Sequence, residues 1–286
     1  MTFASVIQSI IVGLSLGSSY VLMALGLTLM FGILGVVNIS HGVLYMLGAF
    51  GVYYLYIVLG LNFYLAMLAT IATLGLAGFL MERGFYRPVR GEFAPVIVLT
   101  VGLAILIESG GYLILGTQAK GVEHPLVGEM IILGLPLANY RIFTIVIAAI
   151  LVAGMYYLIN QTTIGRKMRA VEEDKVAAAL HGINPNRINA FVFSLGIGLA
   201  AAAGALIAPL YSIQPSMGTM PLAKAFMVIV LGGMGSVPGA ILGALAIGLA
   251  DSLLGVAVGP EPAYIIAWLV IIVVLVIRPR GLLGAY

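Results

Sequence analysis

Residues 5–31 read SVIQSIIVGLSLGSSYVLMALGLTLMF, a run that contains no charged side chain. About 20 apolar residues in a helix cross the hydrocarbon core of a bilayer, so this run is long enough to span a membrane. No Lys or Arg precedes it within residues 1–17, and the apolar sequence continues past the length of a signal peptide. We therefore expect it to be kept as the first membrane helix.

The composition indicates that the rest of the chain also lies in lipid. Of the 286 residues, 62% are hydrophobic and 8% are charged, and the mean hydropathy is +1.18. A water-soluble domain would carry about 25% charged residues. The 37 glycines suit helices that pack in lipid, where small side chains let backbones approach. We predict an all-α fold, a polytopic integral membrane helix bundle that forms one domain over residues 1–286.

Two classes of chemistry are excluded by composition. The chain has no cysteine, which rules out disulfides and thiolate metal sites. The net charge of +3 and the pI of 9.1 do not indicate nucleic-acid binding, because the basic residues lie at the edges of the apolar runs.

The remaining spans follow from the same length criterion. We place them near 39–59, 61–82, 93–116, 138–159, 188–211 and 259–278. Between 222 and 256 the sequence is rich in glycine and includes GGMGSVPG at 232–239. Glycine and proline favour a broken or re-entrant segment there, which gives about 8–10 spans in all. The path of 222–256 and the side of the N-terminus stay open.

Basic residues cluster in three places, which predicts the orientation of the loops. Ten of the 13 Lys and Arg residues are Arg83, Arg87, Arg90, Arg166, Lys167, Arg169, Lys175, Arg187, Arg278 and Arg280. The loop at 117–137 holds only Lys120, beside Glu123 and Glu129. Because cytoplasmic loops of membrane proteins are enriched in Lys and Arg, we expect the three clusters to face the cytoplasm.

Residues 160–187 form the only long polar stretch. Glu172, Glu173 and Asp174 precede an alanine-rich run, which predicts acidic residues in the first turn of a short helix. Gly182 and Pro185 would end that helix. A short exposed helix of small residues suits the groove of another protein, but an ordinary amphipathic surface helix has the same pattern. The residues alone leave both interpretations open.

Three blocks of sequence together resemble the branched-chain amino acid permease family of ABC importers. The first is NISHG at 38–42 followed by MLGA at 46–49, the second is residues 165–184, and the third is LGGMGSVPGA at 231–240. They occur in the family's order over most of the chain. The match departs from the pattern of importers at large at Lys175 and Val176, which interrupt the acidic-alanine motif.

The resemblance implies a role and a set of partners. It implies a permease subunit in the cell inner membrane, with a cytoplasmic coupling loop at 161–187 that contacts an ATPase. The implied coupling residues are Gly165, Arg169, Glu173, Asp174, Ala177, Ala178, Gly182 and Ile183. Expected partners are a second permease subunit (a paralogue or a copy), two ABC ATPase subunits, a periplasmic substrate-binding protein and membrane lipid. The chain lacks a G-x-x-x-x-G-K-[ST] loop, so ATP and Mg²⁺ are expected on the ATPases and no cofactor in this chain.

Several residues inside the apolar runs are candidates for the pathway or for gating. The set comprises Asn38, Ser40, His41, Glu108, Gly232, Gly233, Gly235, Gly239 and Gly243. Glu108 and Asp251 are charged at membrane depth, where a carboxyl serves either transport or packing. The Asn38–His41 segment either caps the next helix or contributes to the pathway. The stripe of small residues that begins at Gly235 has three interpretations: it packs within this chain, it forms the contact with the partner permease, or it is a surface along which helices slide during gating.

Two other function classes fit the sequence less well. An ion-coupled secondary transporter predicts an inverted repeat with paired broken helices, and only one broken segment is evident. A membrane enzyme needs a convergent set of catalytic groups, but His41, His124 and His181 fall in different regions. We therefore predict no catalytic and no metal site. Leucine, isoleucine and valine are the cargo that the resemblance implies, while other amino acids, amides and urea stay open.

Overall fold

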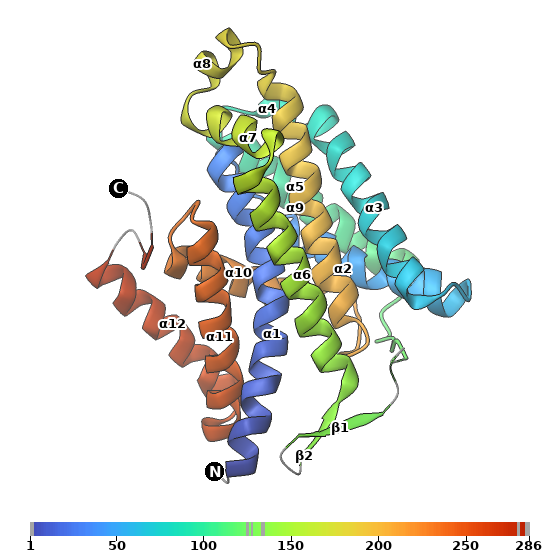
Figure 1. Cartoon of the computed structure of the whole chain (residues 1–286). Helices are drawn as coiled ribbons and strands as arrows, with labels where there is room; N and C mark the ends of the chain where they lie inside the picture. The colour runs from blue at the N-terminus through green and yellow to red at the C-terminus, as the bar shows by residue number, and fades with distance from the viewer. Residues whose placement is uncertain (1–2, 124–125, 127, 133–134, 279–280, 284–286) are drawn as a thin grey trace.

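The computed structural model describes residues 3–123, 126, 128–132, 135–278 and 281–283. They form a bundle of helices with one small hairpin (Figure 1). Eight helices of this described part are long and apolar enough to cross a membrane. The predicted all-α, polytopic membrane fold is confirmed.

The elements of the described residues are α-helices, three π-helical turns and two strands. The helices are α1 (Phe3–Leu29), α2 (His41–Val52), α3 (Phe63–Met81), α4 (Arg87–Val89), α5 (Phe93–Leu115), α6 (Asn139–Gln161), α7 (Thr163–Glu173), α8 (Lys175–Leu180), α9 (Pro185–Ile207), α10 (Thr219–Gly232), α11 (Val237–Val258) and α12 (Pro260–Ile277). Three π-helical turns continue α1, α2 and α3, namely η1 (Met30–Leu34), η2 (Tyr53–Val58) and η3 (Glu82–Tyr86).

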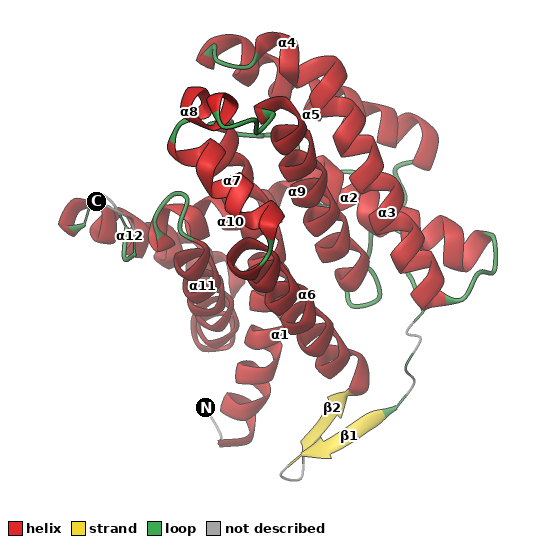
Figure 2. Ribbon diagram, turned by 45° about the horizontal axis from the view of Figure 1, so that its top comes forward, coloured by secondary structure: helices red, strands yellow, loops and turns green. Residues whose placement is uncertain are grey.

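The loop after α5 contains a hairpin that the sequence did not predict. Strands β1 (Glu129–Ile132) and β2 (Leu135–Ala138) pair antiparallel, with Glu129 opposite Ala138 (Figure 2). His124, in the same loop, lies outside the described residues.

The centre of the bundle is formed by α1 and α9. Helix α1 packs along α11, α9, α6 and α10, and helix α9 packs along α3 and α2. The face of α9 is made of small residues, and Ala200–Ala203 are all buried. Small side chains let neighbouring backbones approach, which is how helices associate in lipid. Helices α5 and α12 lie at the edge and leave most of their apolar side chains exposed.

The glycine-rich stretch is a break between a short helix and a full one. Helix α10 has 14 residues, which at about 1.5 Å per residue is roughly 21 Å and too short for a hydrocarbon core of about 30 Å. Gly233 and Gly235 adopt positive φ angles of 101° and 85° and turn the chain. Ser236 then caps α11 by accepting a hydrogen bond from the Gly239 amide at 3.1 Å. The predicted broken segment is confirmed.

The two ends of the bundle differ in what they carry. Helices α4, α7 and α8 lie together at one end, whereas the start of α1 and the β1–β2 hairpin lie at the other (Figure 1). The basic residues of 83–90 and 166–187 therefore share one end. We call it the coupling end, defined by α4, α7, α8 and the start of α9. Arg280 lies outside the described residues.

Candidate functional site

Helix α7 folds back against the end of α6. The Thr162 hydroxyl oxygen accepts a hydrogen bond from the Gly165 amide at 3.1 Å and so caps the new helix. Gly165 lies against the carbonyls of Leu158 and Ile159, where a Cβ atom would overlap the backbone. The Arg169 guanidinium donates to the carbonyl of Ile159. These contacts fix α7 to the end of a membrane helix.

Helix α8 is a separate six-residue helix with its own caps. The Asp174 carboxylate accepts from the amides of Val176 at 2.7 Å and Ala177 at 3.0 Å. At the other end Gly182 has φ +79°, and the Ile183 amide donates to the Ala178 carbonyl at 3.0 Å. The chain therefore leaves α8 in a defined direction.

The predicted start of this helix was wrong, because two of the three acidic residues belong to the preceding helix. Glu172 and Glu173 lie in the last turn of α7 rather than in the first turn of α8, and only Asp174 serves as the predicted helix start. The amphipathic pattern that buries Met168 and Val171 extends the preceding helix up to Glu173.

Helix α8 lies at the tip of the coupling end (Figure 1). Ala178 is buried against the bundle. Val176 is 71% exposed and Leu180, one helical turn later, is 84% exposed. Exposed apolar side chains at the end of a capped helix form a surface suited to a protein groove.

The end of α7 reaches the glycine-rich turn through α1. A Cβ atom on Gly32 in η1 would lie 3.1 Å from Glu172 Oε1 and 3.6 Å from the Gly235 Cα. The Glu172 side chain is exposed as a whole, but burial of its carboxyl end raises its pKa, while nearby Arg169 opposes this. The coupling end thus contacts the break between α10 and α11 by way of one residue.

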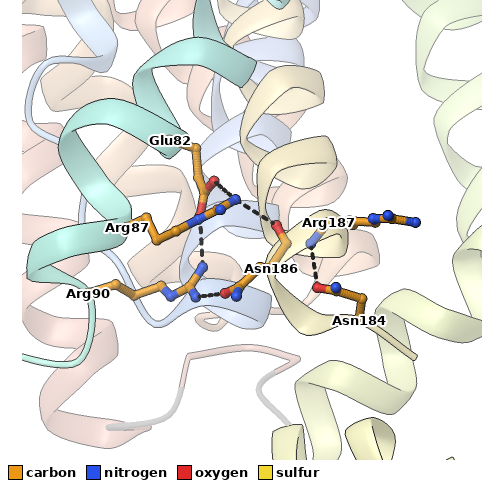
Figure 3. Close-up of polar contacts among 6 residues, drawn as sticks. All are labelled: Glu82, Arg87, Arg90, Asn184, Asn186 and Arg187. Atoms are coloured by element: carbon orange, nitrogen blue, oxygen red, sulfur yellow. Dashed lines mark hydrogen bonds and ion pairs between the residues drawn. The ribbon is translucent and has the colours of Figure 1, made fainter. Parts of the chain in front are cut away.

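A buried ion-pair cluster joins the end of α3 to the start of α9 (Figure 3). Glu82 is fully buried, and its carboxylate accepts from Arg90 Nη1 at 2.8 Å and Arg87 Nη2 at 3.1 Å. Arg90 also donates to Asn186 Oδ1, and Arg87 to the Asn186 carbonyl at 3.5 Å. We call Glu82, Arg87, Arg90 and Asn186 the clamp. It holds two membrane helices together next to α8.

The start of α9 is also fixed from the α8 side. Asn184 Oδ1 accepts from the Arg187 amide at 3.2 Å, and Pro185 occupies the first turn (Figure 3). The sequence reasoning missed the clamp, although an acid at the end of an apolar span followed by Arg after five and eight residues was a usable signal.

Asn38, Ser40 and His41 are buried, but they do not act as the predicted helix cap. Ser40 precedes α2 without a side-chain cap bond. Its hydroxyl instead donates to Asn38 Oδ1 at 2.6 Å, and the Tyr86 hydroxyl donates to the same oxygen at 2.9 Å. The capping interpretation was wrong because a buried tyrosine from a distant element uses the same acceptor. His41 lies between α1 and α9, beside Gly26.

The two candidate acids of the membrane region have different surroundings. Glu108 is half-buried on α5 and forms no hydrogen bond or ion pair with the described residues. Asp251 on α11 binds Lys224 Nζ at 2.6 Å and accepts from the Tyr20 hydroxyl at 3.2 Å. The sequence reasoning did not single out Lys224, although it is a charge within an apolar run.

The glycine stripe on α11 faces α10 of the same chain. At Gly239 a Cβ atom would overlap the Gly232 carbonyl. At Gly243 it would lie 3.1 Å from the Val228 carbonyl oxygen. These two positions serve close packing within the chain, while Gly233 and Gly235 form the turn between the two helices. Within the described residues no three His, Asp or Glu side chains gather to hold a metal ion.

Comparison with known proteins gives a consistent result. The family described as branched-chain amino acid transport system / permease component matches residues 9–275. The permease BraD of Pseudomonas aeruginosa is 33% identical, over 97% of this chain and 95% of BraD. The permease LivH of Escherichia coli is 30% identical, over 99% of this chain and 96% of LivH. Both are named high-affinity branched-chain amino acid transport system permease proteins.

A more distant match is the ribose import permease RbsC of Haemophilus influenzae, 28% identical over 82% of this chain and 73% of RbsC. That relative is named for the import of a sugar rather than of an amino acid. With the fold, the span count and these matches in agreement, this chain belongs to the branched-chain amino acid transport system permease family.

Proposed function

We propose that this chain is the membrane-spanning permease subunit of an ATP-driven importer that carries branched-chain or related amino acids across the inner membrane. Family membership supports the transport class and the cargo. The alternative of an ion-coupled secondary transporter is not favoured, because the relatives are permease components of import systems.

The observation that carries the coupling role is the geometry of α8. The helix is capped at both ends, lies at the tip of the bundle and exposes Val176 and Leu180. A rigid helix with exposed apolar side chains outside the membrane spans is a suitable docking element through which a separate ATPase can move the membrane helices. In this proposal Gly165, Arg169 and Asp174 hold α7 and α8 in shape.

The partners follow from the same proposal. Two ABC ATPase subunits, which bind ATP and Mg²⁺, would contact the coupling end, and a second permease subunit would lie beside this chain in the membrane. By the enrichment of Lys and Arg in cytoplasmic loops, the coupling end faces the cytoplasm. The start of α1 and the β1–β2 hairpin then face the periplasm, where a substrate-binding protein would dock. This chain itself needs no cofactor.

Motion of α8 has two routes into the membrane. One runs through α7 and Gly32 to the glycine-rich turn between α10 and α11. The other runs through Asn186 and the clamp to α3 and α9. Closure of the ATPase dimer would displace α8 and move the attached helices as rigid bodies, which gives alternating access.

The experiment uses the complete transporter, with its own ATPase, second permease and binding protein, in proteoliposomes. Val176→Asp and Leu180→Asp place charges on the α8 surface and should abolish co-purification of the ATPase and ATP-dependent leucine uptake. Ile131→Asp is the matched control for co-purification of the ATPase alone, because Ile131 is 74% exposed at the end opposite to α8. Wild-type uptake driven by an ion gradient without ATPase subunits would refute the proposal.

A further inference from the structure

A cavity of 270 Å³ lies between α1, α2, α9 and α10. Its wall belongs to the half of the bundle away from the coupling end, since it includes residues at and beyond the end of α9. Tyr211 and Met220 are exposed and border its mouth. Ser19, Tyr45 and Lys224 are buried and form its floor. The cavity therefore opens towards the end that carries the hairpin.

The floor of the cavity contains Lys224, whose buried charge is not readily explained by packing. Lys224 has 6% of its side chain exposed and its partner Asp251 has 14%. Charged side chains inside a membrane are costly, and they usually mark the path of a solute or an ion. Replacing such a pair by apolar residues is often neutral or stabilising, so stability is a weak reason for it.

The bonding capacity of the pair is not exhausted. A Lys ammonium has three N–H donors. One is used by Asp251 Oδ1 at 2.6 Å, and the Tyr264 ring lies 4.9 Å from Nζ. Tyr20 uses its O–H on Asp251 Oδ2, which leaves the lone pairs of the phenol oxygen available. A donor and an acceptor thus stand side by side in the wall of one cavity.

We propose that this cavity is a transient binding site for the amino acid zwitterion during translocation. The carboxylate of the solute accepts a hydrogen bond from Lys224 Nζ, and its ammonium donates to the Tyr20 oxygen. Ile207, Met217 and Met220 supply the apolar wall for the branched side chain. The 270 Å³ of the cavity lies just below the range of about 300–1,000 Å³ for small-molecule sites, as expected for a solute as small as leucine.

Two larger hollows lack this chemistry, whereas a hollow of 310 Å³ that is lined by Arg90, Glu92 and Lys175 lies at the coupling end. One of 540 Å³ between α3, α6 and α9 is lined by apolar side chains apart from Ser194. Another of 510 Å³ between α1, α6 and α11 offers only Ser18 and Tyr156 as polar groups. Neither presents a cation to a carboxylate, so both suit lipid chains better than a zwitterion.

The site rests on the proposed function, and the test separates the two. The complete transporter is assayed in proteoliposomes with leucine-loaded binding protein, for both leucine uptake and stimulated ATP hydrolysis. Wild-type protein that shows no ATP-dependent uptake of leucine, isoleucine or valine refutes the proposed function. The variants test the proposed site by comparison with a wild-type transporter that takes up leucine.

The main variant is Lys224→Met combined with Asp251→Asn, which removes both charges and leaves no unpaired ion. Leucine uptake should fall by about tenfold or more, the loss expected from one charge-assisted hydrogen bond. Stimulated ATP hydrolysis should stay near the wild-type rate, because the coupling end is untouched. Unchanged uptake would show that the pair only packs α10 against α11, and would overturn the proposed site.

A second variant decides the matter if the double variant fails to assemble. Tyr20→Phe keeps the ring and the Lys224–Asp251 ion pair, and it removes the acceptor for the ammonium together with the hydrogen bond to Asp251 Oδ2. It should lower uptake without lowering stimulated ATP hydrolysis. Tyr156→Phe is the matched control, since its hydroxyl borders the 510 Å³ hollow instead. Equal uptake by the two Phe variants would overturn the proposed site.

Discussion

The clamp offers a sharp test of how the coupling end is held together. Glu82→Gln keeps the shape of the side chain and removes its charge. One guanidinium can still donate to the remaining amide oxygen, but the other then faces an NH₂ donor. Both bonds, at 2.8 Å to Arg90 and 3.1 Å to Arg87, are charge-assisted in the native chain.

The magnitude follows from the exposure of the three groups. Removing one partner of a buried ion pair costs about 3–5 kcal/mol. Arg87 and Arg90 have 33% and 16% of their side chains exposed, so water regains part of their solvation. We therefore expect a loss of about 2–3 kcal/mol in the free energy of unfolding, or roughly 5 °C in Tm.

The assay is thermal unfolding of the purified chain in detergent, followed by the fraction that stays monodisperse. Glu92→Gln is the matched control, because Glu92 lies exposed in the same loop and forms no ion pair among the described residues. A double-mutant cycle with Arg90→Gln should give a coupling energy of about 1 kcal/mol or more. Equal Tm shifts for Glu82→Gln and Glu92→Gln, or strict additivity in the cycle, would refute the reasoning.

Three further outcomes are expected from the same geometry. Asp174→Ala should remove the N-terminal cap of α8 and destabilise that helix locally by about 1 kcal/mol. Hydrogen exchange of the α8 amides should become faster while Tm stays unchanged, and Asp174→Asn should behave as wild type. Gly239→Ala should lower Tm by forcing α10 and α11 apart, at about 1–3 kcal/mol, while Gly255→Ala in the same helix, where nothing lies within 4 Å, should not; a Tm loss in both would contradict this. Tyr86→Phe should cost about 1 kcal/mol through the lost bond to Asn38, and an unchanged Tm would show that the bond contributes nothing.

The membrane class and the approximate spans were predictable because they depend on local composition. A run such as 5–31 has no other favourable solvent than lipid, whatever the rest of the chain does. The break at 232–239 was predictable for the same reason, since glycine and proline act through the backbone of their own segment. The division of 160–187 into α7 and α8 was missed because Glu172 and Glu173 fit the end of one helix as well as the start of another.

The sequence by itself determined the solvent, the helical class, the family resemblance and the glycine-rich break, all of which are written in short stretches of the chain. Only the tertiary structure decided that Arg90 donates to Asn186, that the Tyr86 hydroxyl donates to Asn38 Oδ1 and that Lys224 pairs with Asp251. These pairs join helices far apart in the sequence. Their partners depend on how small residues on α1 and α9 let the helices meet, and that is a property of the whole packed bundle.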